Sequence, residues 1–276
     1  MEQALLSIRG LRKSYGSFEA IKGVDIDFYP GEFVVLIGSS GAGKSTFVRC
    51  INRMIDPNAG EITVDGVHME ALRGTALRRQ RARIGMIFQH YNLIGRVNVI
   101  KNIMHGLLGQ TSFIKSLFGI YPEEEKRKAL DLLEEVGLSE QMYKRADALS
   151  GGQMQRVGIC RAIMQNPKLL LADEPIASLD PKSSETVMDC LKRITEQRGL
   201  CCIVNLHQVE FARQYADRIV GIKDGRVVFD GKPEQLTEEK VQEIYARNDA
   251  TASSPDETQT VVAYDMPERM AEATCA

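Results

Sequence analysis

The sequence predicts an α/β fold with a central, largely parallel β-sheet. Short apolar runs typical of buried strands alternate along the chain with segments of helical periodicity. The run at 33–37 lies between Gly31 and Gly38, as expected for a strand that is covered on both faces. The chain has 276 residues, of which 43% are hydrophobic and 26% charged, so it is large enough to bury a core.

The predicted elements are assigned from apolar runs, helical periodicity and Gly or Pro turns. In chain order they are strands 5–9, 24–28 and 33–37, a helix from Lys44 to about Met54, strands near 61–65 and 84–88, helices at 124–136 and from about 152 to 165, a strand at 168–172, a helix at 184–197, a strand at 201–205, a helix at 208–215, and strands at 218–222 and 226–229. Gly16 and Gly23 are expected in the loop between the first two strands. Asp224-Gly225 is expected to turn the last hairpin.

Two changes of character suggest how the chain is divided. Residues 90–160, roughly, are mostly helical and are predicted to form a subdomain inserted into the core. Residues 1–247 are predicted to form one domain and 248–276 a tail with six acidic residues and a single base, Arg269. Such a composition with poor apolar periodicity is typical of a flexible appendage, and a regulatory role is the alternative.

Composition and charge limit the possible functions. The 35 basic and 37 acidic residues give a formal net charge of −2, which argues against a nucleic-acid binder that depends on bulk charge. No stretch approaches the ~18 apolar residues of a membrane-spanning helix, and the N-terminus does not resemble a signal peptide. We therefore expect a cytoplasmic chain, for which a membrane partner is still compatible.

The six cysteines show no C-x-x-C spacing, and most stand in apolar stretches. Reduced thiols in the core of a cytosolic protein are therefore expected. Structural disulfides or a zinc site are the alternatives.

Residues 38–46 match the phosphate-binding motif G-x-x-x-x-G-K-[ST] between a predicted strand and a predicted helix. Glycines let backbone N–H groups turn toward phosphates, and the helix N-terminus adds a positive dipole. Lys44 can reach the β- and γ-phosphates, and Ser45 can ligate Mg²⁺. The residues expected to bind ATP in this P-loop are Gly38, Ser39, Ser40, Gly41, Ala42, Gly43, Lys44, Ser45 and Thr46.

An acidic pair ends the apolar strand at 168–172. Asp173 can hold Mg²⁺ through water. Glu174 can polarise an attacking water, and general-base assistance of this kind typically contributes ~10²–10⁴-fold to a rate. Such a pair alone is more often a turn or a helix cap, but in a chain with a P-loop it indicates catalysis.

Another motif, Ser150-Gly151-Gly152-Gln153, opens a predicted helix and offers a second anion-binding site. Alone it is also compatible with an ordinary N-cap. With the P-loop and the acidic pair in this order, it resembles the nucleotide-binding subunits of ABC transporters over residues 5 to about 245. The resemblance implies the ABC ATPase fold: a P-loop NTPase core with a mixed or parallel sheet, an N-terminal antiparallel β part and the inserted helical subdomain.

Further residues match the family pattern. Tyr15 resembles the aromatic that stacks on adenine, and Gln89 resembles the glutamine that contacts Mg²⁺ and water and senses the membrane partner. Asp180 lies in a stretch that resembles the loop crossing the dimer, and His207 resembles the histidine that contacts the γ-phosphate. The implied catalytic residues are Glu174, His207 and Gln89; the implied metal ligands are Ser45, Gln89 and Asp173; and Ser150, Gly151, Gly152, Gln153 and Asp180 are implied to bind ATP.

The resemblance also implies partners. The P-loop of one chain would hold ATP while Ser150-Gly151-Gly152 of a second copy caps the γ-phosphate, so that ATP joins a head-to-tail homodimer. Two transmembrane permease subunits would bind this dimer at the cytoplasmic face of the membrane. A substrate-binding protein would act indirectly, and no nucleic-acid partner is expected.

Stretches outside the shared motifs resemble phosphonate-import ATPases in particular. They are 109–119, Arg145-Ala146-Asp147, 205–209 and the hairpin at 224–231. The resemblance implies import of phosphonates or related phosphorus oxyanions, and importers of polar amino acids, methionine or phosphate are the alternatives. A nucleic-acid-handling ABC ATPase is a remote alternative, because those relatives usually carry two cassettes or long coiled coils. A P-loop kinase would leave 149–153 and His207 without a role.

The interval 71–122, called the basic interval below, contains eight bases and no acid. It includes Gln89 and three apolar residues that are expected to be exposed, Phe113, Leu117 and Phe118. One interpretation is a solvated helical face with ordinary core residues. The other, which the position of Gln89 favours, is a groove for a permease helix with bases near anionic headgroups. The bases are Arg73, Arg78, Arg79, Arg81, Arg83, Arg96, Lys101 and Lys115.

Overall fold

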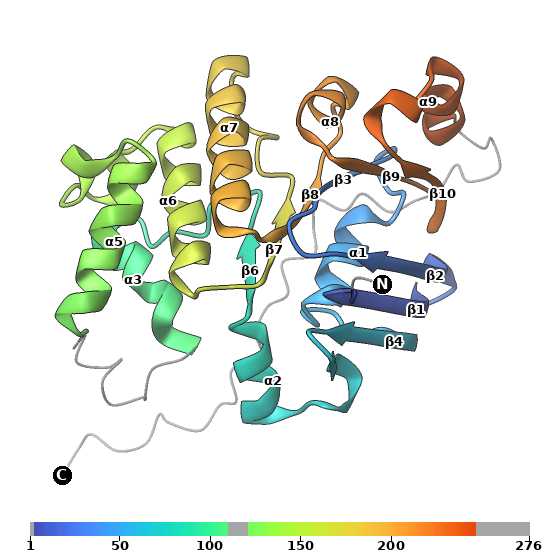
Figure 1. The fold of residues 1–276 in the computed structure, drawn as a ribbon, viewed down its shortest axis with the longest axis horizontal. Coiled ribbons are helices and arrows are strands. Elements are labelled where there is room, and N and C mark those ends of the chain that lie inside the picture. Colours follow the sequence, from blue (N-terminus) through green and yellow to red (C-terminus); the bar gives the residue numbers. More distant parts are fainter. Residues whose placement is uncertain (1–2, 110–120, 247–276) are drawn as a thin grey trace, which may run out of the picture. The chain divides into compact units, whose positions relative to one another are not determined.

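The structure is a computed structural model and describes residues 3–109 and 121–246 (Figure 1). Its central sheet has the strand order β10-β9-β3-β8-β7-β6. The mutually parallel strands of this sheet are β3 (Phe33–Ile37), β6 (Ile84–Ile87), β7 (Leu169–Asp173), β8 (Cys201–Asn205) and β9 (Arg218–Lys223). Strand β10 (Arg226–Gly231) pairs antiparallel with β9, which confirms the predicted hairpin. The predicted α/β class is confirmed.

Side chains of the central strands alternate between two cores. On β3, Phe33, Val35 and Ile37 face one core, and Val34 and Leu36 face the other. All five side chains are fully buried. A strand covered on both faces reads as a continuous apolar run, and this is why the sequence at 33–37 and 201–205 predicted central strands correctly.

A second, antiparallel sheet lies on one side of the central sheet. It has the order β2-β1-β4-β5 and comprises β1 (Leu6–Tyr15), β2 (Phe18–Phe28), β4 (Ala59–Val64) and β5 (Val67–His68). The prediction that Gly23 lies in a loop was wrong, because Gly23 is inside β2 and only Gly16 is in the turn. Gly23 has φ +77° where the pairing with β1 shifts register, which is a conformation that glycine adopts readily at a β-bulge.

Helices cover both faces of the central sheet (Figure 1). With the antiparallel sheet lie α1 (Lys44–Ile51) and α2 (Gly74–Arg81); on the other side lie α3 (Val99–Met104), α5 (Glu123–Glu135), α6 (Gly151–Met164), α7 (Pro181–Arg198), α8 (Val209–Tyr215) and α9 (Glu238–Tyr245). Helix α7 begins earlier than predicted, because Asp180 caps it and Pro181 occupies its first position. Helix α1 ends earlier than predicted, since the chain turns at Arg53 with φ +50°.

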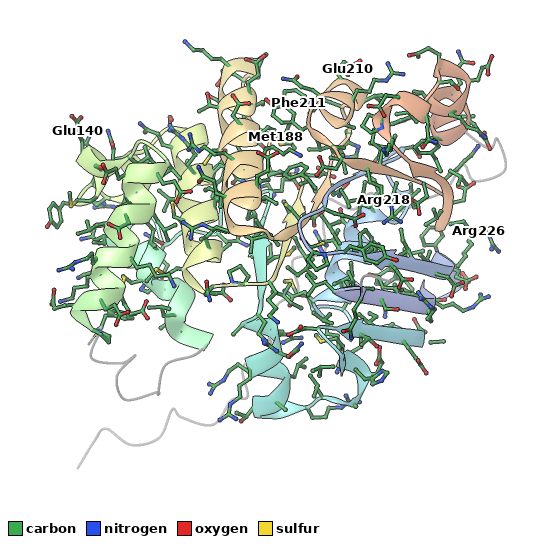
Figure 2. The ribbon with its side chains drawn as sticks, in the orientation of Figure 1. Glu140, Met188, Glu210, Phe211, Arg218 and Arg226 are labelled. Atoms are coloured by element: carbon green, nitrogen blue, oxygen red, sulfur yellow. The ribbon has the colours of Figure 1, made fainter. Side chains whose placement is uncertain are left out.

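The two sheets are joined by side chains as well as by the core. Arg218, labelled in Figure 2, donates to both carboxylate oxygens of Asp230 at 2.6 and 2.7 Å. It also donates to the carbonyl of Asp27 on β2 at 2.9 Å. One guanidinium thus links β9, β10 and the antiparallel sheet.

Two further predictions can be compared with the described residues, and others lie outside them. Cys50, Cys160, Cys190, Cys201 and Cys202 are free thiols and buried, as expected. Among the residues that the structure describes, no helix has both the length and the apolar character needed to cross a membrane. The tail at 248–276, Cys275 and the apolar residues Phe113, Leu117 and Phe118 lie outside the described residues.

Candidate active site

Parallel strands bring the predicted functional residues to one edge of the central sheet. Gly38 follows β3, Gln89 comes two residues after β6, Asp173 ends β7, and His207 comes two residues after β8. Because carboxyl ends of parallel strands meet at the same edge, residues far apart in sequence become neighbours there. This is the edge at which open α/β sheets bind ligands.

The P-loop keeps close contact with two other strands. Gly38 has φ +152°, and a Cβ atom there would lie 2.1 Å from the carbonyl oxygen of Ile222. Gly43 has φ +101°, and its Cβ would lie 2.4 Å from the carbonyl oxygen of Ala20. Only glycine fits at these two positions, which fixes the path of the loop into α1.

Lys44 begins α1 and is only 4% exposed. Its Nζ donates to the carbonyl oxygens of Gly38 at 2.7 Å and Ser39 at 2.9 Å. A buried ammonium needs such acceptors, since an unpaired charge in the interior costs a large free energy. The loop therefore folds around the cation that the sequence assigned to the phosphates of ATP.

Ser45 and Asp173 come together through Asn205. The Nδ2 atom of Asn205 donates to Oδ1 of Asp173 at 2.9 Å and to Oγ of Ser45 at 3.2 Å. Arg49, one turn along α1, lies 3.2 Å from the other carboxylate oxygen of Asp173. Hydroxyl and carboxylate oxygens are the ligands that Mg²⁺ prefers, so this donor set fits the ion. Gln89, the third predicted ligand, is half-buried beyond β6, and its role stays a prediction.

Glu174 and His207 form a second pair at the same edge. Oε1 of Glu174 lies 2.6 Å from Nε2 of His207, and the hydroxyl of Tyr245 donates to the carbonyl of His207 at 3.1 Å. The hydrogen bond with His207 lowers the pKa of Glu174, although partial burial acts to raise it. The carboxylate is therefore ionised at neutral pH, which is the form that accepts a proton.

The backbone of Glu174 is in an uncommon conformation. Its φ is +51°, in the left-handed region that non-glycine residues rarely adopt. Its N–H donates to the carbonyl of Asn205 at 3.2 Å, which holds the residue directly after β7. Uncommon backbone conformations of this kind cluster at functional sites.

The motif at 150–153 forms the N-terminus of α6. The N–H of Gln153 donates to Oγ of Ser150 at 3.3 Å, and the N–H of Ser150 donates to Oε1 of Gln153 at 3.0 Å. This is a capping box, so the N-cap interpretation of the sequence is correct for the single chain. A role of these residues toward ATP stays a prediction.

The start of α7 lies beside this motif. A Cβ atom on Gly151 would lie 3.0 Å from a methyl group of Leu179, and one on Gly152 would lie 3.1 Å from Cβ of Ser183. Asp180 accepts a hydrogen bond from the N–H of Ser183 at 3.0 Å. Hydrogen bonding to the side chain of Ser183, and then to this N–H, lowers the pKa of Asp180. The two segments that the resemblance assigned to the dimer interface are therefore neighbours.

Tyr15 stands at the end of β1 and is 47% exposed, with Nζ of Lys13 at 5.2 Å from its ring centroid. Phe18 pairs with Tyr15 in register and is exposed to a similar degree, at 50%. An exposed aromatic pair at a hairpin end is suited to stacking on a planar base. Stacking of Tyr15 on adenine stays a prediction, and Phe18 joins it as a candidate.

Three residues of this site were not selected from the sequence. Asn205 is a polar residue at the end of the apolar run 201–205, which is an available signal. Arg49 follows Ser45 by four positions, so that both lie on one face of a helix. Phe18 became a candidate only through its register with Tyr15.

The fold and the cluster of Lys44, Ser45, Asp173 and Glu174 define the class of ATP-hydrolysing P-loop cassettes. A sequence model described as "ABC transporter" matches residues 21–177. The chain therefore belongs to the ABC transporter family, whose ATP-binding proteins hydrolyse ATP.

Curated relatives match this chain over most of their own length. The phosphonates import ATP-binding protein 2 of Oceanobacillus iheyensis is 52% identical over 242 residues, which cover 87% of this chain and 95% of the relative. The phosphonates import ATP-binding protein of Treponema denticola is 48% identical over 236 residues, covering 85% of this chain and 92% of the relative.

Solved structures share the fold. A dimeric ATP-binding cassette in a post-hydrolysis state, bound to ADP and phosphate, superposes with a TM-score of 0.72 at 32% identity, covering 83% of this chain and 98% of that chain. A cassette from the cbiONQ transporter complex of Clostridium perfringens has a TM-score of 0.75 at 29% identity, covering 88% of this chain and 94% of that chain. The predicted ABC ATPase fold is confirmed.

Proposed function

We propose that this chain is the ATP-hydrolysing subunit of an importer for phosphonates or related phosphorus oxyanions. The observation that carries the substrate class is the 52% and 48% identity, over most of each chain, to proteins named for phosphonate import. The shared ATP chemistry is common to transporters of many substrates, so it supports the importer ATPase but does not distinguish its cargo.

Mg²⁺-ATP is the proposed substrate of the site. Lys44 and the N-terminus of α1 bind the phosphates, and Ser45 and Asp173 hold the metal with Gln89. The residues that hold Mg²⁺ would thereby supply a positive charge against the phosphates. Glu174 accepts the proton of the attacking water, and His207 positions Glu174 and reaches the γ-phosphate.

A head-to-tail homodimer completes the site in this proposal. The start of α6, with Ser150, Gly151 and Gly152, caps the γ-phosphate held by the second copy, and Asp180 lies beside it. A dimeric cassette with ADP and phosphate among the structural neighbours supports this arrangement. The packing of Leu179 against Gly151 supports one shared surface for both segments.

The permease is proposed to dock near Gln89 at the cytoplasmic face of the membrane. Ile94 is 52% exposed and Leu108 is 43% exposed, and both lie in the basic interval. Some bases of the basic interval have partners within the chain. Arg83 pairs with Asp65 at 2.9 Å, and Arg81 donates to the carbonyl of Asn52 at 3.0 Å. The exposed apolar residues of the basic interval are thus the stronger support for docking, with the remaining bases contributing near anionic headgroups.

Reconstitution tests the substrate class. The chain would be assembled with its membrane permease and binding protein in nanodiscs, and ATPase activity measured with a phosphonate, phosphite, phosphate, methionine or a polar amino acid. We expect stimulation by the phosphonate or phosphite, and none with the Glu174→Gln subunit. Stimulation by methionine or a polar amino acid alone would overturn the substrate class, and co-purification of RNA or DNA instead of a permease would overturn the importer.

A further inference from the structure

Asn205 occupies a central position among the candidate active-site residues. It is the last residue of β8 and is fully buried. In the sheet it pairs in register with Asp173 on β7 and with Leu36 on β3. Asn205 therefore lies between the strand that leads into the P-loop and the strand that carries the metal-binding acid.

Both the side chain and the main chain of Asn205 form hydrogen bonds with neighbouring active-site residues. Its side-chain Nδ2 donates to Asp173 at 2.9 Å and to Ser45 at 3.2 Å, which uses both hydrogens of the amide. Its main-chain carbonyl accepts from the N–H of Glu174 at 3.2 Å. One residue thus fixes the hydroxyl, the carboxylate and the backbone of the proposed base.

The remaining polar atom of the Asn205 side chain is Oδ1. Its Oδ1 is buried and has no hydrogen-bond partner among the described residues. Buried amide oxygens are mostly satisfied by protein or by ordered water, so this oxygen is available to accept a hydrogen bond from water. The two side chains that Asn205 does contact are both proposed metal ligands.

The fully buried asparagine of α3 makes a different set of contacts. Asn102 is also fully buried, but its amide accepts from the N–H of Ile94 at 2.8 Å and donates to carbonyls of Val97 and Asn98 at 3.2 and 3.1 Å. It satisfies the backbone of its own segment. Asn205 instead connects side chains from α1 and β7, which is the arrangement of a residue that orients metal ligands.

We propose that Asn205 is a positioning residue for Mg²⁺, an inference that rests on the proposed Mg²⁺-ATP site. Its Nδ2 orients the oxygens of Ser45 and Asp173, and its Oδ1 accepts a hydrogen bond from water that hydrates the ion. Removal of residues that orient metal ligands typically costs 10–100-fold in metal affinity. The hydrogen bonds of Lys44 to the carbonyls of Gly38 and Ser39 do not involve Asn205.

The test compares Asn205→Ala with Asn102→Ala in the purified full chain. Binding of a fluorescent, non-hydrolysable ATP analogue would be measured during a MgCl₂ titration and again in EDTA, and the melting temperature of each variant recorded. We expect Asn205→Ala to raise the half-saturating Mg²⁺ concentration about tenfold or more while keeping the EDTA affinity within about twofold of wild type. Asn102→Ala should lower the melting temperature and leave the Mg²⁺ titration unchanged.

The outcomes separate the two levels of the proposal. Wild type that binds nucleotide no better with Mg²⁺ would overturn the Mg²⁺-ATP site itself. Normal Mg²⁺ dependence in wild type and in folded Asn205→Ala, or an equal shift in Asn102→Ala, would overturn only the role of Asn205. If Asn205→Ala does not fold, Asn205→Ser is used in its place, because its hydroxyl can donate to only one of the two oxygens. The half-saturating Mg²⁺ concentration of that variant then decides.

Discussion

At the scale of single residues, burial gives the cation of the P-loop specific partners within the chain. Lys44 illustrates this, because its ammonium is almost fully buried and is held by carbonyls of the loop that it follows. The same loop supplies N–H groups and a helix N-terminus, which favour an anion. A phosphate bound there would lie beside this charge. The function of this residue therefore depends on the conformation of its neighbours.

Lys44→Ala is expected to abolish tight ATP binding and transport together. Hydrogen bonds to a charged group contribute about 1.5–3 kcal/mol each, so losing the ammonium should weaken nucleotide binding by tenfold to a hundredfold or more. Equilibrium binding of a fluorescent ATP analogue checks this. Normal affinity in the variant would contradict the assignment of the P-loop.

The Glu174–His207 pair predicts a pH-dependent contribution to stability. The pKa of Glu174 is lowered from 4.5 in the folded chain, so its ionised form is favoured by folding. Its contribution is present above the unfolded pKa and is lost as the pH falls through the lower folded pKa. Chemical unfolding from pH 7 to pH 4 should show Glu174→Gln less stable than wild type at pH 7, with the difference closing below about pH 4.5.

Glu140→Gln is the matched control for that series. Glu140 is an exposed glutamate in a short turn of helix, visible at the edge of Figure 2, and pairs with no base in the described residues. Glu140→Gln should therefore have nearly the same free energy of unfolding as wild type at every pH. A constant difference for Glu174→Gln over the whole range would show that its ionisation is not coupled to folding.

At the scale of elements, the N-terminus of α6 combines a structural role with a proposed functional one. Ser150 and Gln153 satisfy two backbone N–H groups reciprocally, which begins the helix at Gly151. The same N-terminus presents a positive dipole, which favours an anion. One helix end can therefore be stable alone and bind a phosphate in a dimer.

Two variants separate these roles. Ser150→Ala removes the cap, so the free energy of unfolding should fall by about 1 kcal/mol. Ser150→Asp keeps a side chain that caps well but places a negative charge at the proposed γ-phosphate contact. Urea unfolding and ATP-dependent dimerisation should show the alanine variant destabilised, and the aspartate variant stable yet unable to dimerise. A dimer formed normally by Ser150→Asp would remove Ser150 from the phosphate contact.

At the scale of the whole molecule, the proposed assembly depends on ATP that is bound and not hydrolysed. Glu174→Gln keeps the shape of the side chain but cannot accept a proton, so turnover should fall about 10²–10⁴-fold while ATP still binds. Size-exclusion chromatography with Mg²⁺-ATP should then show a stable dimer, with a monomer in ADP. A monomer at saturating Mg²⁺-ATP would contradict the sandwich arrangement.

If the permease docks on the basic interval, a change there should uncouple ATPase activity from transport substrate while nucleotide binding is retained. Ile94→Glu puts a charge on a side chain that is 52% exposed, and loss of a buried apolar contact in an interface costs about 1–2 kcal/mol, or roughly tenfold in affinity. Substrate-stimulated ATPase in nanodiscs should fall, while ATP binding and melting temperature of the isolated subunit are retained. Met54→Glu is the control, because Met54 is equally exposed at 50% and lies outside the basic interval. Equal effects of both variants would place the docking surface elsewhere.

Local patterns determined much of this protein without its tertiary structure. The run at 33–37 predicted its strand because a strand buried on both faces must be apolar throughout. The P-loop, the acids at 173–174 and the motif at 150–153 were recognised because their chemistry requires residues that are close in sequence. Gly23 was misplaced, since a bulge inside a strand has the same glycine signal as a turn.

The tertiary structure decided which distant residues share the site. The sequence marks Asn205 only as a polar end of an apolar run and does not give its role, because its hydrogen bonds to Ser45 and Asp173 join residues brought together by the order of strands in the central sheet. The left-handed backbone of Glu174 and its pairing with His207 likewise depend on strand β8 lying beside β7. The sequence thus determined the chemical groups, which are local, whereas their distances and partners follow from long-range strand pairing.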